Sequence, residues 1–104
     1  MRAGRLILAG ALALSLSACA TATMRQNAEK VDVVALNAYA SVAASVNTYE
    51  AMPGRTDAEK ASAEAVRTKA WTLLAQEHAL YQSGVVADIS ALMALVQTAA
   101  NLGK

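Results

Sequence analysis

The sequence predicts an all-α protein, folded as a small up-down-up bundle of three helices. Alanine, the residue with the highest helix propensity, occupies 26 of the 104 positions. One proline and five glycines are too few for the many turns of a β-sandwich or barrel. Apolar residues also recur every three or four positions in two long segments, which is the spacing of helices that pack side by side.

The first helix is expected from about Met24 to Ala51. A seam of small and apolar residues follows it in steps of four and three: Met24, Ala28, Val31, Ala35, Ala38, Val42, Ser45 and Tyr49. Tyr39 and Val46 widen this seam on one side. Met52-Pro53-Gly54 ends the helix, because proline lacks a backbone donor and restricts the residue before it.

The second helix is expected from Asp57 to about Gln82. Thr56 and Glu59 have the spacing of a capping box, with Thr56 as the N-cap. Its seam, widened on one side by Leu74 and Tyr81, consists of Ala63, Val66, Ala70, Leu73, Glu77 and Leu80. Glu77 is the polar exception, which either sets the register of the helices or bends out to solvent.

A third helix is expected from Val85 to about Leu102, after a break at Ser83-Gly84. Its apolar arc is wide: Val85, Ile89, Leu92, Met93, Leu95, Val96, Ala99 and Ala100. One neighbouring helix cannot cover such an arc, so we expect this helix to pack in the groove between the first two. Two alternatives are a hairpin in which the second and third helices are continuous, and a homo-oligomer completed by the third helix.

The N-terminus has the form of a secretory signal peptide. Arg2 and Arg5 make it basic, and an uncharged stretch of 13 residues runs from Leu6 to Ala18. That stretch is shorter than the roughly 20 residues that a membrane span needs. We therefore divide the chain into a signal peptide (1–18), a short N-terminal linker (19–23) and a helical bundle domain (24–104).

The end of this stretch, Leu16-Ser17-Ala18-Cys19, resembles the lipobox of bacterial lipoprotein precursors. The resemblance implies cleavage between Ala18 and Cys19, diacylglyceryl transfer to the Cys19 thiol, and acylation of the new N-terminus with a fatty acid such as palmitate. Three acyl chains anchor a protein stably to a membrane. Ala20 stands where inner-membrane lipoproteins carry a retention Asp, so the resemblance implies the outer membrane, facing the periplasm. An ordinary signal peptide with an incidental cysteine is the alternative.

The residues that carry chemistry are few, and we expect no enzyme, cofactor or small-molecule substrate. Lipidation uses the only cysteine, and no repeated ligand spacing suggests a metal site. His78, the only histidine, points about 100° away from Glu77 on a helix, so the two are not expected to form a dyad. Once Arg2 and Arg5 are removed, seven basic and eight acidic residues remain, so no basic field favours nucleic acid.

One interaction patch is predicted on the second helix, consisting of Trp71, Leu74, His78 and Tyr81. The competing interpretation is a large aromatic residue at the rim of a small core. The membrane, through the N-terminal lipid, and a protein of the cell envelope are the expected partners. The sequence thus predicts a lipid-anchored interaction module. The alternative is a self-associating structural or phage-type, spanin-like lysis lipoprotein. A carrier of apolar ligands is less well supported, because alanine-rich seams close cavities.

Overall fold

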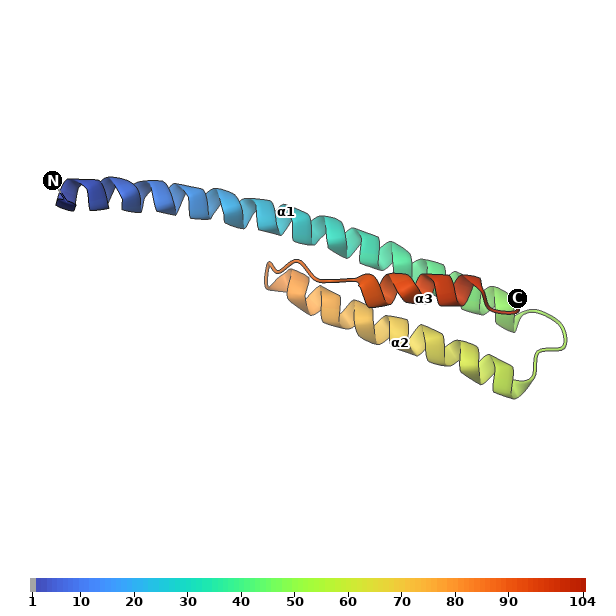
Figure 1. Ribbon diagram of the computed structural model, residues 1–104. Helices are drawn as coiled ribbons and strands as arrows, with labels where there is room; N and C mark the ends of the chain where they lie inside the picture. Colours follow the sequence, from blue (N-terminus) through green and yellow to red (C-terminus); the bar gives the residue numbers. More distant parts are fainter. Residues whose placement is uncertain (1) are drawn as a thin grey trace.

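In the computed structural model the chain forms three α-helices, α1 (Arg2–Glu50), α2 (Asp57–Gln82) and α3 (Ser90–Ala100). The structure describes the side chains of residues 24–104. The predicted signal peptide, its cleavage between Ala18 and Cys19 and the lipidation of Cys19 concern residues outside this range, and the structure does not test them. Each helix packs against the other two, and α3 runs back along the antiparallel pair of α1 and α2 (Figure 1). This arrangement confirms the predicted all-α fold and its up-down-up order.

The connection between α1 and α2 forms where the sequence predicted it. α1 ends at Glu50, just before Pro53, and Gly54 takes a positive φ of 83°. The backbone N–H of Glu59 donates to Thr56 Oγ1 (3.1 Å), and the Thr56 N–H donates to Glu59 Oε1 (3.0 Å). Both bonds of the capping box are thus present, and α2 begins at Asp57 as expected.

The α1–α2 loop is also tied by side chains. Glu59 Oε2 accepts hydrogen bonds from the Tyr49 hydroxyl (3.1 Å) and from Arg55 Nη1 (3.0 Å). The Arg55 guanidinium lies 4.6 Å from the centre of the Tyr49 ring. Hydrogen bonds from Thr56, Arg55 and Tyr49 lower the pKa of Glu59 to about 2. Glu59 therefore stays ionised over most of the pH scale and keeps these contacts.

The start of the third helix was predicted wrongly. α2 ends in a Schellman motif: Gly84, with φ 74°, donates to the Tyr81 carbonyl, and Val85 donates to the Leu80 carbonyl. The next helical residue is Ser90 and not Val85, because the Asp88 carboxylate accepts hydrogen bonds from the Ser90 N–H (2.9 Å) and from its hydroxyl. These local bonds compete with helix formation. The alternative in which α2 and α3 are continuous is therefore wrong.

The core lies between the three helices and is built largely from small residues. Ala35, Ala63 and Ala70 are completely buried, which lets the backbones of α1 and α2 approach closely. The largest fully buried side chains are Leu92, Val42 and Val46. The other buried apolar residues are Ala28, Ala38, Tyr49, Leu74, Leu95 and Ala99.

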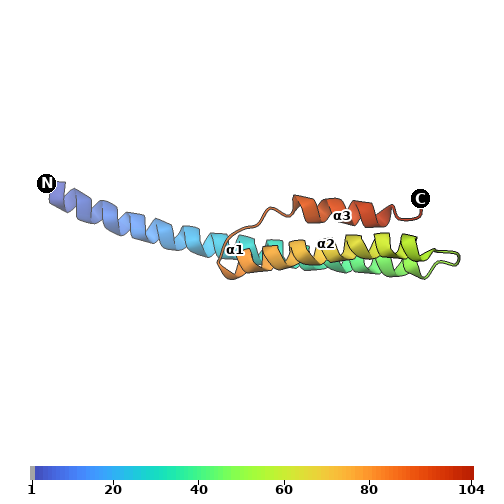
Figure 2. The same cartoon turned by 90° about the horizontal axis from the view of Figure 1, so that it is seen from below.

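Several seam positions differ from the prediction. Met24 and Leu80 are exposed, whereas Leu74, expected at the side of the seam, is buried. α3 lies on one face of the α1–α2 pair, so it buries only part of its apolar arc (Figure 2). Leu92, Leu95 and Ala99 face inward, but Met93 is 43% exposed. Within the described part of the chain, no helix has the length and hydropathy needed to cross a membrane.

Candidate functional site

An uncharged groove runs between α1 and α2. It has a volume of about 340 Å³, and its lining residues are Leu36, Trp71, Leu74, Ala75, His78, Ala79 and Gln82. Leu36 is the contribution of α1, and all the others come from α2. None of these side chains is Lys, Arg, Asp or Glu, so the groove offers an apolar surface with one imidazole and one amide. We call these seven residues the Trp71 groove.

The Trp71 groove lies on the side of the hairpin away from α3. The start of α3 meets α2 over a different set of residues, which line a recess of about 80 Å³: Leu73, Gln76, Glu77 and Leu80. At about 100° per residue, these positions lie on the opposite face of α2 from Trp71, Ala75 and Gln82. The view in Figure 2 shows the same arrangement, with α3 on one side of the α1–α2 layer. Among the described residues, no third helix covers the groove that α1 and α2 form.

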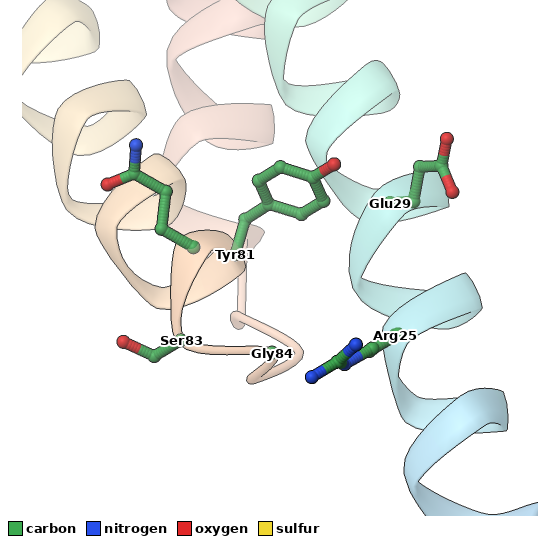
Figure 3. Close-up of a pocket in the computed structure, with 6 residues that line it drawn as sticks. Arg25, Glu29, Tyr81, Ser83 and Gly84 are labelled. Atoms are coloured by element: carbon green, nitrogen blue, oxygen red, sulfur yellow. The ribbon is translucent and has the colours of Figure 1, made fainter.

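The structure brings three of the four predicted patch residues into one groove. Trp71 is 58% exposed, whereas Leu74 forms the buried floor. The fourth, Tyr81, stacks on the His78 ring with centroids 5.6 Å apart. Tyr81 itself lines an adjacent polar cleft with Arg25, Glu29, Gln82, Ser83 and Gly84 (Figure 3). Leu36 was missed in the sequence, because a seam pattern detects buried faces and gives no signal for an exposed groove wall.

Below the groove, His78 takes part in a polar cluster that sequence reasoning did not find. Its Nδ1 lies 3.1 Å from Oδ1 of Asp32 on α1. Asp32 is 8% exposed and Glu77 3% exposed, so two carboxyl groups are buried between α1 and α2. Asp32 therefore has His78 as its hydrogen-bond partner, with the buried Glu77 nearby. The available signal was the spacing of Asp32, four residues after Ala28 and three before Ala35, which places it on the buried face of α1.

The buried carboxyl group of Glu77 has a raised pKa. Burial, followed by hydrogen bonding to Asp32 and by its charge, raises the pKa of Glu77 to about 7. Oε2 of Glu77 is buried and has no hydrogen-bond partner. A protonated Glu77 carboxyl gains an O–H group, which can donate a hydrogen bond to a neighbouring acceptor such as the Asp32 carboxylate. One of the two sequence interpretations was that Glu77 bends out to solvent. That interpretation is wrong, because Glu77 is buried.

The groove offers an exposed apolar surface for binding. Within residues 24–104, no group of three or more His, Cys, Asp or Glu side chains is placed to hold a metal ion. Together, the fold and the groove define a small helical-bundle protein with an uncharged interhelical groove. Comparison with protein-family models, with curated proteins and with solved structures found no match to the chain.

Proposed function

We propose that the protein is a lipid-anchored lipoprotein of the outer membrane, facing the periplasm, whose bundle is a protein-interaction module in the cell envelope. The lipobox residues Leu16-Ser17-Ala18-Cys19 support the anchor. The Trp71 groove carries the interaction part of the proposal. We assign the module no reaction and no cofactor, and its partner is a protein of the envelope.

A helix is the occupant that best fits the groove. The antiparallel helices α1 and α2 form its walls. A helix of the partner, lying between them on the side away from α3, would be the fourth helix of a bundle with ordinary packing. Peptides that bind in this way insert apolar side chains spaced every three or four residues. The exposed indole of Trp71 suits the role of anchor, since tryptophan is enriched at the energetic centres of interfaces. The partner we propose is therefore an apolar-faced helix of another envelope protein.

Photo-crosslinking in living cells tests the docking proposal. A photoreactive amino acid at Trp71 should give a discrete adduct with a different envelope protein. The same probe at Ala65, an exposed position on the outer side of α2, should not. Leu36→Glu places a charge in the groove and should abolish the Trp71 adduct, whereas Ala65→Glu should preserve it. Adducts with copies of this chain alone would replace docking by self-association, which the structural or spanin-like alternative requires.

Lipid labelling tests the anchor separately. Cells supplied with labelled palmitate should incorporate it into the wild-type chain, and Cys19→Ser should abolish incorporation. The wild-type protein should sediment with the outer membrane on a density gradient, and the Cys19→Ser protein should leave that fraction. Equal labelling of both proteins would contradict the proposal, because Cys19 is the only cysteine of the chain.

A further inference from the structure

His78 belongs to two parts of the molecule at once. Its ring forms part of the wall of the Trp71 groove, and its Nδ1 lies 3.1 Å from the Asp32 carboxylate. Burial and the neighbouring Asp32 together raise the pKa of Glu77. A single imidazole thus joins the groove to a buried carboxyl pair, and any movement of that pair reaches the groove through this ring.

The charged and titratable groups around Asp32 and Glu77 do little to neutralise the negative charge of an ionised Glu77. From α1 come Asp32 and, along the Tyr81 cleft, Arg25 and Glu29; from α2 come His78 and Tyr81. The segment before α3 contributes Asp88, which lines the same recess as Glu77. Hydrogen bonds from the Ser90 side chain and backbone lower the pKa of Asp88, so this neighbour is an anion. None of the ion pairs among the described residues includes Glu77.

The pair therefore has two states with different packing. When Glu77 is protonated, it donates to Asp32, and Asp32 accepts from His78 at the same time. When the proton leaves, two buried carboxylates face each other, and burial of an uncompensated charge is costly. Glu77 must then turn away from Asp32 or admit water, and the recess of about 80 Å³ beside Leu73, Leu80 and Leu92 is the adjoining space. Either change weakens the contact between α1 and α2 at this end.

We propose that a proton shared by Asp32 and Glu77 regulates the Trp71 groove: its loss separates α1 from α2 near Asp32 and displaces the His78 ring. The effect on partner binding rests on the proposed function, whereas the effect on the groove does not. The raised pKa of Glu77 sets the pH window. The contribution of protonated Glu77 to the stability of the folded protein is complete below the ordinary pKa of about 4.5. That contribution is lost as the pH rises through about 7. The form in which α1 and α2 pack together and shape the Trp71 groove is thus the form at lower pH.

The chain carries its own reporters for this change. Trp71 is the only tryptophan and His78 the only histidine, so indole fluorescence and imidazole NMR signals each report one residue. The full chain in detergent should show a change in Trp71 emission with a midpoint near pH 7. Glu77→Gln, which imitates the protonated carboxyl, should abolish it. Asp32→Asn should move the midpoint down by about one pH unit or more, because it removes the neighbouring negative charge.

Two controls keep the result decisive. Glu29→Gln removes a nearby exposed carboxylate and should leave the midpoint unchanged. Circular dichroism at pH 5 and pH 9 should show that each variant keeps its helices. A Trp71 transition that persists in Glu77→Gln and disappears in His78→Gln would overturn the proposal, because the histidine alone would then titrate. A wild-type protein without any transition between pH 5 and pH 9 would overturn it as well.

The crosslinking experiment separates this proposal from the proposed function. In cells held at pH 6 and at pH 8, the Trp71 adduct should fall about fivefold at the higher pH, a coupling of ordinary size for linked sites. Glu77→Gln should remove that difference. Equal yields at both pH values in the wild type would overturn the regulation and leave docking intact. Absence of the adduct at both would overturn docking, and the fluorescence titration alone would then decide whether the groove is proton-linked.

Discussion

The indole of Trp71 lies edge-on against the ring of Tyr39, with centroids 5.4 Å apart and an interplanar angle of 62°. Tyr39 is on α1 and half-buried, so the pair connects the two helices at the Trp71 groove. Edge-to-face aromatic pairs contribute about 0.5–1.5 kcal/mol beyond the area that they bury. The contact holds a largely exposed indole in one position on the surface and so gives the groove a fixed wall.

Replacement of Tyr39 tests this contact. Tyr39→Leu should reduce the free energy of unfolding by about 1 kcal/mol and shift Trp71 emission to longer wavelength, because the indole gains contact with water. Urea denaturation followed by circular dichroism gives the first quantity, and steady-state fluorescence gives the second. Val34→Ala, at an exposed position of the same helix, is the matched control and should change neither. An unchanged emission spectrum in Tyr39→Leu would show that the ring does not position Trp71.

The packing of α3 depends most on Leu92, which is 1% exposed. Leu92→Ala should cost about 2–5 kcal/mol of unfolding free energy, because it leaves a cavity in a core that is otherwise rich in alanine. The neighbouring Met93→Ala changes a residue that is 43% exposed and should stay within about 0.5 kcal/mol of the wild type. Denaturant titration of the three proteins measures the differences. Similar losses for both variants would mean that α3 does not pack through this face.

The close approach of α1 and α2 should make small residues at their interface irreplaceable. Ala63 is completely buried on α2, whereas Ala65 on the same helix is exposed. Ala63→Leu should destabilise the protein by about 1–3 kcal/mol, because additional methyl groups force the helices apart. Ala65→Leu leaves the packing untouched and should be close to neutral, since leucine is also a good helix former. Thermal unfolding of both variants, compared with the wild type, provides the test.

The dependence of stability on pH should have two limbs with different origins. Glu59 has a lowered pKa of about 2, so its contribution is complete above about pH 4.5 and is lost as the pH falls. Glu77 has a raised pKa of about 7, so its contribution is complete below about pH 4.5 and is lost as the pH rises. From these two groups, the free energy of unfolding should be greatest near about pH 4.5–5.

Two substitutions assign the limbs. Glu77→Gln should flatten the alkaline limb, and Glu59→Gln should flatten the acidic limb and lower the stability near its maximum. Glu64→Gln, an exposed carboxylate on α2, should alter neither limb appreciably. Urea midpoints measured at intervals from pH 2 to pH 9 check the pattern. An alkaline limb that survives in Glu77→Gln would show that another group is responsible for it.

Much of the fold could be predicted because its boundaries are marked by local signals. Pro53, the Thr56 capping box and Gly84 each act within a few residues, so the sequence alone predicts the end of α1 and both ends of α2. The start of α3 could not be predicted in the same way. The apolar spacing continues back to Val85, but the hydrogen bonds that Ser90 donates to the Asp88 carboxylate favour a non-helical conformation there.

The candidate site could be predicted only in part, because it depends on contacts between distant segments. The spacing of Trp71, Leu74 and His78 on one helix is visible in the sequence. Their pairing with Leu36 and Asp32 is set by the register of α1 against α2, which periodicity does not specify. Leu74 is buried and Leu80 is exposed, which likewise depends on how α1 lies against α2.

Glu59 is hydrogen-bonded to Arg55 and Tyr49 at the α1–α2 loop, so α1 and α2 can separate only at their opposite end, near Asp32. At pH 7 the loop end stays closed while the Asp32 end loses its proton, so the hairpin opens about a fixed hinge. A short tether maintains an effective concentration of the order of millimolar between the parts that it joins. Reclosure is therefore a first-order process whose rate does not change with the amount of protein, and each molecule can respond to pH by itself.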